Sequence, residues 1–129
     1  MTSPMPNLNP RVALVEPSLF LQHLIKKNLD SLEMSLQDIY VTGTEILQDH
    51  GRSFDMLLID YNLPDMTGLA LAEKILHDTI YARLVLIIPE SLSHESQDFI
   101  AHGLQATLVK PFSEEALQKV LIEAIANAW

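Results

Sequence analysis

Three ionisable residues of this 129-residue chain, Glu16, Asp60 and Lys110, each come directly after a short apolar run. Clustered carboxylates repel each other unless a cation neutralises them, and Mg²⁺ prefers one or two carboxylates together with waters and phosphate oxygens. A lysine nearby supplies a mobile positive charge that suits a phosphoryl group. If these side chains meet, the chemistry they suggest is an aspartate that accepts or mimics a phosphoryl group beside a metal ion.

The elements that must position these residues follow from the spacing of the apolar residues. Short apolar runs bounded by proline, glycine or charged residues predict strands, and apolar residues at three- and four-residue spacing predict helices between them. The predicted strands are Val12–Val15, Leu36–Val41, Asp55–Ile59, Leu84–Ile88 and Ala106–Val109. The predicted helices run from Ser18 to Leu32, Thr44 to His50 before Gly51, Leu69 to Leu76, Ser91 to His102 before Gly103, and from the N-cap Ser113 to Ala128.

This alternation of five strands and five helices predicts an α/β fold. Parallel strands need crossover connections, and the natural crossover is a helix. We therefore expect a doubly wound, five-stranded parallel sheet in a three-layer sandwich. In such sheets ligands bind at the carboxyl ends of the strands, which here are followed or formed by Glu16, Asp60, Ile88 and Lys110.

Composition and charge exclude several other classes of protein. Apolar residues make up 48% of the chain, as in a globular domain, and 17 Asp and Glu against 8 Lys and Arg give a net charge of −9. The longest basic run is Lys26-Lys27, so direct binding to nucleic acid is not expected. The longest apolar run, Leu84–Ile88, is too short to span a membrane. The absence of cysteine removes thiolate chemistry, and the glycines form no dinucleotide or nucleotide motif.

The first ten residues, MTSPMPNLNP, contain three prolines and no positive charge. They lack the features of a signal peptide, so we expect a flexible lead-in over residues 1–10 of a cytoplasmic protein. The folded domain is expected to occupy residues 11–129.

Two motifs support a family resemblance. They are Leu57-Leu58-Ile59-Asp60-Tyr61-Asn62-Leu63-Pro64-Asp65-Met66-Thr67-Gly68 and, about fifty residues later, Val109-Lys110-Pro111-Phe112. With the fivefold βα pattern, they make the chain resemble the receiver domains of bacterial two-component response regulators, the CheY-like family with a flavodoxin-like sandwich. The resemblance covers nearly the whole chain, from about Arg11 to Ala128.

The resemblance implies a role for each site residue. Asp60 would be the phosphoacceptor, and Lys110 would contact the phosphoryl group. Glu16, Asp60 and the backbone carbonyl of Asn62 would hold Mg²⁺, and Lys110-Pro111 would be a cis peptide. From the residues alone, Glu16 remains as compatible with a cap on the following helix as with a metal contact.

Three positions depart from the family pattern. Pro17 stands where a second acid normally binds the metal, Ile88 replaces the Ser or Thr that hydrogen-bonds the phosphoryl group, and Thr107 replaces the aromatic switch residue. Loss of a direct metal ligand predicts weak Mg²⁺ binding. Loss of the hydroxyl removes one contact by which the phosphorylated state is distinguished.

Two functions follow from the resemblance, both of them signalling roles and not enzymatic ones. In the first, a histidine kinase or histidine phosphotransfer protein phosphorylates Asp60, and binding to a downstream protein partner, an output domain or a second copy in a homodimer changes. In the alternative, a pseudo-receiver binds protein partners without phosphorylation. A third class, a small flavin enzyme of similar shape, is disfavoured because the loop after the first strand lacks a phosphate cradle. No nucleic-acid or membrane contact is expected.

Overall fold

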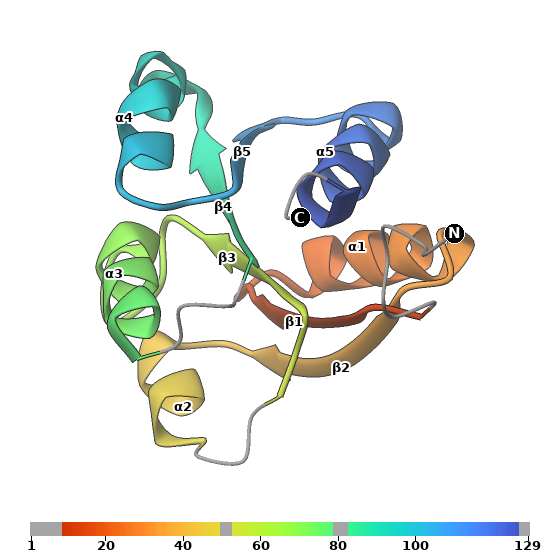
Figure 1. Cartoon of the computed structure of the whole chain (residues 1–129), viewed down its shortest axis with the longest axis horizontal. Helices are drawn as coiled ribbons and strands as arrows, with labels where there is room; N and C mark the ends of the chain where they lie inside the picture. The colour runs from red at the N-terminus through yellow and green to blue at the C-terminus, as the bar shows by residue number, and fades with distance from the viewer. Residues whose placement is uncertain (1–8, 50–52, 79–82, 127–129) are drawn as a thin grey trace, which may run out of the picture.

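The computed structural model describes residues 9–49, 53–78 and 83–126. Its centre is a parallel sheet of five strands in the order β2-β1-β3-β4-β5. The strands are β1 (Arg11–Val15), β2 (Ser35–Tyr40), β3 (Met56–Asp60), β4 (Arg83–Pro89) and β5 (Ala106–Lys110). The predicted doubly wound α/β fold is therefore confirmed (Figure 1).

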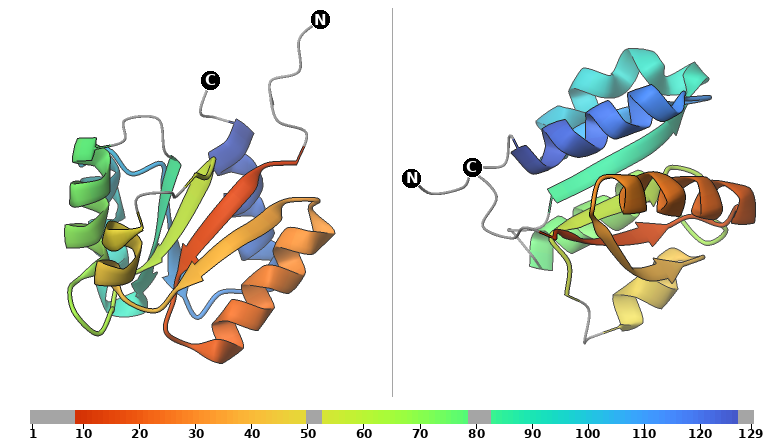
Figure 2. Two further views of the ribbon diagram at one scale, coloured as in Figure 1. Left: turned by 90° about the horizontal axis from the view of Figure 1, so that it is seen from below. Right: turned by 90° about the vertical axis from the view of Figure 1, so that its right-hand side faces the viewer.

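Helices cover both faces of the sheet. They are α1 (Leu19–Ser31), α2 (Gly43–Gln48), α3 (Gly68–Asp78), α4 (Ser96–Ala101) and α5 (Glu114–Ala126), with a 3₁₀ helix, η1 (Glu90–Glu95), before α4. Figure 2 shows α1 and α5 on one side of the sheet and α2 and α3 on the other. This three-layer arrangement follows from the right-handed crossovers between parallel strands.

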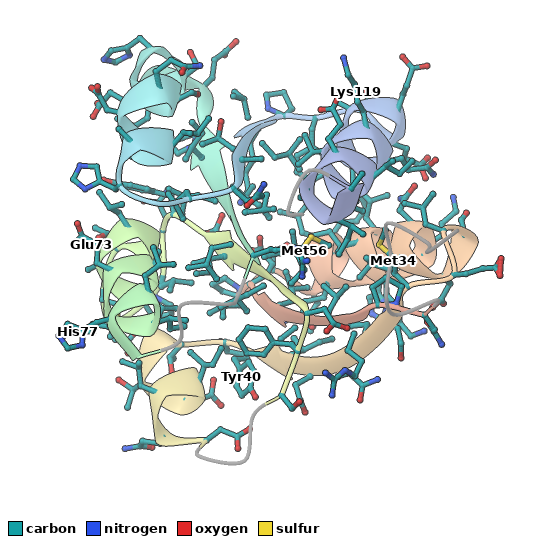
Figure 3. The ribbon with its side chains drawn as sticks, viewed as in Figure 1. Met34, Tyr40, Met56, Glu73, His77 and Lys119 are labelled. Carbon is teal, nitrogen blue, oxygen red and sulfur yellow. The ribbon has the colours of Figure 1, made fainter. Side chains whose placement is uncertain are left out.

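Alternate residues of the central strands supply two separate cores. Val12 and Leu14 of β1 face α1 and α5, whereas Ala13 and Val15 face α2, α3 and α4. Because β3 and β4 are covered on both faces, almost all of their residues are buried, which explains their continuous apolar runs. Figure 3 shows Met34 and Met56 on the α1 and α5 side, Tyr40 near α2, and Glu73, His77 and Lys119 pointing outward.

Several predicted boundaries shift in the structure. β3 and β5 each extend to include the charged residue that was expected to follow them, and β4 extends through Pro89. Pro89 is tolerated because it is the last residue of the strand, where its missing N–H interrupts no further pairing. Gly51, Ala128 and residues 1–8 lie outside the described residues.

The single helix predicted from Ser91 to His102 is wrong. The structure has η1 followed by α4, which begins only at Ser96. The Ser96 hydroxyl donates a hydrogen bond to the carbonyl of Ser93 at 2.9 Å. Serine side chains that bond to nearby backbone compete with regular helical turns, and η1 has no buried residue to favour a continuous helix. Gly103 ends this region with a φ of 103°, as its glycine predicts.

Candidate functional site

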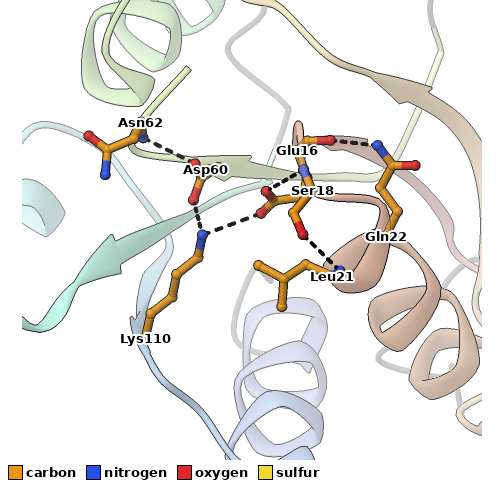
Figure 4. A network of polar contacts seen from close by, with 7 residues as sticks. All are labelled: Glu16, Ser18, Leu21, Gln22, Asp60, Asn62 and Lys110. Atoms are coloured by element: carbon orange, nitrogen blue, oxygen red, sulfur yellow. Dashed lines mark hydrogen bonds and ion pairs between the residues drawn. The ribbon is translucent and has the colours of Figure 1, made fainter. Parts of the chain in front are cut away.

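The carboxyl ends of three strands bring the predicted site residues together. Asp60 is the last residue of β3, Lys110 is the last residue of β5, and Glu16 follows β1. β1 and β3 are neighbours, so Glu16 and Asp60 lie side by side. Lys110 lies one strand farther away, across β4, and reaches the carboxylates with its long side chain (Figure 4).

Lys110 joins the two carboxylates. Its Nζ lies 2.7 Å from Oδ1 of Asp60 and 3.7 Å from Oε1 of Glu16. Glu16 is 1% exposed and Asp60 is 3% exposed. One ammonium group therefore faces two buried carboxylates, an arrangement that also attracts a further cation.

Glu16 supports the start of α1 with one of its two carboxylate oxygens. Its Oε2 accepts a hydrogen bond of 3.1 Å from the amide of Ser18, the residue that caps α1. Its Oε1 is buried and has no hydrogen-bond partner, although it faces Lys110. Burial raises the pKa of the Glu16 carboxyl and the nearby Asp60 adds to this, while the Ser18 amide and Lys110 lower it. One carboxylate oxygen thus supports the helix start, and the other is directed toward the site.

Asp60 is held by the loop that follows it. Its Oδ2 accepts a hydrogen bond of 3.2 Å from the amide of Asn62. The amide of Gly68 donates to the carbonyl of Tyr61 at 2.7 Å. A side chain at Gly68 would collide with the carbonyl oxygen of Asp60, so only glycine allows α3 to begin this close to the end of β3.

The positions that depart from the family pattern have different surroundings. Ile88 is fully buried in the core under α2, α3 and α4. The hydroxyl of Thr107 donates to Ser96 Oγ at 3.1 Å, which connects β5 to the start of α4. Pro17 is half-buried between Glu16 and the cap of α1. The Lys110-Pro111 peptide bond is cis.

The oxygen atoms at this edge suit Mg²⁺. Two carboxylates lie together, and one of them has a buried oxygen without a hydrogen bond. Within the described ranges, no group of three or more His, Cys, Asp or Glu side chains could hold a metal ion. A magnesium site here would therefore need a main-chain carbonyl and waters beside Glu16 and Asp60, which is a common way of binding this ion.

Sequence reasoning missed the residues that support the site through the backbone. Gln22, buried on α1, donates to the carbonyl of Glu16 at 2.7 Å. Asp65 accepts hydrogen bonds from the amides of Gly43 and Thr44. The spacing of Thr42 and Glu45 is a capping-box signal for the start of α2. No local pattern indicates that Asp65 also binds there.

A family model for the response regulator receiver domain matches residues 12–122. The chain belongs to this family. Receiver domains are signalling modules of two-component systems, and they generally bind Mg²⁺ at the active site.

Individual relatives agree with this assignment. CheY1, a chemotaxis protein of Helicobacter pylori, is 26% identical over 86% of this chain and 93% of its own length. The regulatory protein LuxO of Vibrio cholerae is 26% identical over 89% of this chain. A transcription factor of Schizosaccharomyces pombe, prr1, is 28% identical over 92% of it. This chain spans 25% of the length of LuxO and 22% of the length of prr1.

Solved receiver structures match the fold over nearly the whole chain. A signal receiver domain from Vibrio parahaemolyticus is 25% identical, with a TM-score of 0.82 over 94% of this chain and 93% of its own. The chemotaxis response regulator CheY4 of Vibrio cholerae is 24% identical, with a TM-score of 0.78 over 90% of this chain and 98% of its own.

The longest helices of the described part, α1 and α5, have 13 residues each, too few for a helix to cross a bilayer.

Proposed function

We propose that this receiver domain accepts a phosphoryl group on Asp60 from a histidine kinase or a histidine phosphotransfer protein. The observation that carries the proposal is the 2.7 Å contact between Lys110 Nζ and Asp60 Oδ1 at the buried end of the sheet. A carboxylate oxygen of Asp60 forms a bond to phosphorus while the bond from phosphorus to the donor's imidazole nitrogen breaks. The imidazole leaves with the electron pair of that bond and takes up a proton from solvent.

Lys110 suits this transfer because its flexible side chain can pair first with the Asp60 carboxylate and then with the phosphoryl oxygens. Before transfer, Lys110 neutralises Asp60, and the same ammonium group can turn to the phosphoryl oxygens once Asp60 is esterified. Its side chain is 30% exposed, so the group is accessible from the open edge of the sheet. Glu16 adds a second carboxylate beside it, whose Oε1 has no hydrogen-bond partner and can face a cation.

Mg²⁺ fits the remaining oxygen atoms. Glu16, Asp60 and the main-chain carbonyl of Asn62 would hold it, with waters and phosphoryl oxygens completing its coordination. When bound, the ion supplies positive charge that offsets the negative oxygens of the phosphoryl group. Because Pro17 supplies no carboxylate, we expect binding to be weak, in the millimolar range, as ligand changes commonly cost tenfold or more in affinity. A titration that gives micromolar affinity would contradict this expectation.

Phosphorylation would act on partner binding through the α4 and β5 region. Ile88 offers no hydroxyl to the phosphoryl group, and Thr107 is already hydrogen-bonded to Ser96. We therefore infer a smaller difference between the phosphorylated and the unphosphorylated state than a receiver with a hydroxyl at position 88 would have.

The proposal also includes a downstream protein partner, an output domain in a longer chain or a homodimer. It further includes the domain limits of residues 11–129, the cytoplasmic location and the bacterial origin.

Intact mass measurement tests the proposal. The folded protein is incubated with acetyl phosphate and Mg²⁺ beside an Asp60→Asn variant. We expect a mass increase of one phosphoryl group in the wild type only. An unmodified wild type that is shown to be folded would overturn the proposal and favour a module that binds partners without phosphorylation.

A further inference from the structure

Asp65 connects the loop after Asp60 to α2, a helix that comes about twenty residues earlier in the chain. Its Oδ1 accepts a hydrogen bond of 2.9 Å from the amide of Gly43, and its Oδ2 accepts one of 2.9 Å from the amide of Thr44. The hydroxyl of Thr44 donates to the same Oδ2 at 2.5 Å. Both oxygens of this exposed carboxylate thus accept hydrogen bonds from residues that lie 22 and 21 positions earlier in the chain.

The start of α2 does not depend on Asp65 alone. Thr42 and Glu45 form a capping box, in which the amide of Glu45 donates to Thr42 Oγ1 at 3.1 Å and the amide of Thr42 donates to Glu45 Oε1 at 3.0 Å. The capping box occupies the amides of Thr42 and Glu45, while Asp65 accepts from those of Gly43 and Thr44. The contact of Asp65 therefore adds a link between two segments to a helix start that has its own local cap.

The residue next to Asp65 reinforces this link by packing. Met66 lies so close to Gly43 that a side-chain Cβ built on this glycine would be 2.5 Å from Met66 Sδ. Gly43 is buried, and its lack of a side chain is what allows the approach. Two successive residues of the loop thus contact the first turn of α2, one by hydrogen bonds and one by van der Waals contact.

The loop is also closed on itself, so the position of Asp65 affects the residues near the site. Asn62 and Thr67 form an isolated antiparallel bridge, and the amide of Gly68 donates to the carbonyl of Tyr61. The amide of Asn62 in turn donates to Asp60 Oδ2. A displacement of the middle of this short loop must move Asn62 or break one of these contacts.

We propose that Asp65 is a positioning residue, which anchors the loop from Tyr61 to Gly68 on α2 and thereby sets the orientation of the Asn62 carbonyl and the Asp60 carboxylate. This inference rests on the proposed function of Asp60. Asp65 acts through the backbone of the loop, because its carboxylate binds Gly43 and Thr44 at the start of α2. The pKa of Asp65 is lowered mainly by the hydrogen bond from the Thr44 hydroxyl, followed by that from the Gly43 amide. The carboxylate therefore stays charged as an acceptor.

Hydrogen exchange of single amides, followed by NMR without metal ion or phosphodonor, tests the anchoring directly. In Asp65→Ala we expect the amides of Asn62 and Gly68 to exchange on the order of tenfold faster, because hydrogen bonds to a charged acceptor are lost. Asp65→Asn should be intermediate, since its amide oxygen can still accept from one of the two backbone amides. The matched control is Glu45→Ala, which removes the other cap of the same helix without touching the loop.

The Mg²⁺ dependence of phosphorylation by acetyl phosphate gives the second measurement. Asp65→Ala should need several times more Mg²⁺ for half-maximal rate, with a smaller change in the rate at saturation, whereas Glu45→Ala should resemble the wild type. Equal exchange of the Asn62 and Gly68 amides in the Asp65→Ala and Glu45→Ala variants would overturn the inference, because fraying of α2 would then explain the effect. Unchanged exchange in Asp65→Ala would overturn it as well.

These results separate this inference from the proposed function. A wild type that is phosphorylated, with loop amides that ignore Asp65, overturns the positioning role and leaves Asp60 as the acceptor. A wild type that takes no phosphoryl group overturns the proposed function, and with it the catalytic purpose of the anchoring, whatever the exchange rates show.

Discussion

Lys110 is the only basic side chain that the described residues place in contact with Glu16 and Asp60. It serves two buried carboxylates with one positive charge. Removing the ammonium group leaves both carboxylates without compensation in a poorly hydrated place, which costs more than an ion pair itself contributes. The stability of the site therefore depends on this one ammonium group.

Substitution of Lys110 should show this dependence. We expect Lys110→Ala to lower the free energy of unfolding by about 1.5–3 kcal/mol, the range for hydrogen bonds to charged groups. Urea unfolding measures the difference. Lys119→Ala on α5, whose side chain points outward, is the matched control and should change little (Figure 3). Equal stability of the two variants would show that the contacts of Lys110 contribute nothing in solution.

The buried carboxyl of Glu16 predicts a dependence of stability on pH. Because the pKa of Glu16 is raised above 4.5 in the folded state, the folded protein binds the proton more tightly than the unfolded chain does. The resulting stabilisation is fully present below the unfolded pKa and is lost as the pH rises through the folded pKa. Glu16→Gln keeps the neutral form at every pH, so it should melt at a higher temperature than the wild type at neutral pH without Mg²⁺.

The difference in melting temperature between Glu16→Gln and the wild type should shrink on acidification. As the pH falls toward 4.5, the melting temperatures of Glu16→Gln and the wild type should converge. Glu123→Gln, at an exposed position of α5, controls for the loss of one negative charge from an acidic protein. A difference that grows on acidification would show that charge, and not burial, dominates at Glu16.

The meeting of Glu16, Asp60 and Lys110 could be predicted from the sequence for a simple reason. Apolar runs locate parallel strands, and the carboxyl ends of parallel strands share one edge of the sheet. The supporting contacts of Gln22 and Asp65 could not be predicted, because each depends on a backbone group brought close by the fold. Local sequence carries no signal for such partners.

At the scale of elements, strands were predicted more accurately than the segment between β4 and β5. Buried strands such as β3 and β4 read as continuous apolar runs with sharp ends. The segment from Glu90 to Ala101 is mostly exposed and polar, with Phe99 as its one buried residue. A weak apolar pattern could not decide between one helix and a 3₁₀ turn followed by a short helix.

Ile88 at the end of β4 tests how the switch depends on this region. Ile88→Thr should cost about 1–3 kcal/mol of stability, because it buries a hydroxyl in an apolar core. In return, we expect a longer lifetime of the phosphorylated form or a larger change in partner affinity, because the hydroxyl can donate to the phosphoryl group. Urea unfolding and the decay of the phosphorylated mass measure the two effects.

The control for this substitution is Ile88→Val. It removes one methylene, at a cost of about 0.5–1.5 kcal/mol, without adding a hydroxyl. Valine should leave the lifetime of the phosphorylated form unchanged. A threonine variant that behaves like the valine variant in lifetime and in partner binding would mean that the switch does not pass through position 88.

At the scale of the whole molecule, the site lies at the switch point of the sheet. The chain winds from β1 to β2 on one side and then crosses to β3 on the other, so β1 and β3 meet where the strand order reverses. Crevices at such points bind ligands in open α/β sheets. The two cores on either side of the sheet hold this edge in place.

The relatives place the same fold in different settings. CheY1 consists almost entirely of a region matched by this chain, whereas LuxO and prr1 are much longer. The matched region is thus nearly the whole of one relative and a minor part of the others.

The most direct test of this central claim is to locate the phosphoryl group. The protein is treated with acetyl phosphate and Mg²⁺, then reduced with borohydride, which converts an aspartyl phosphate to homoserine, and its peptides are sequenced by mass spectrometry. For the wild type, we predict homoserine at position 60, in the peptide that contains Asn62. For the Lys110→Ala variant, we predict that homoserine at position 60 is absent or that its yield is strongly reduced. Homoserine at another aspartate, or at none in a folded sample, would contradict the assignment of Asp60 as the phosphoacceptor.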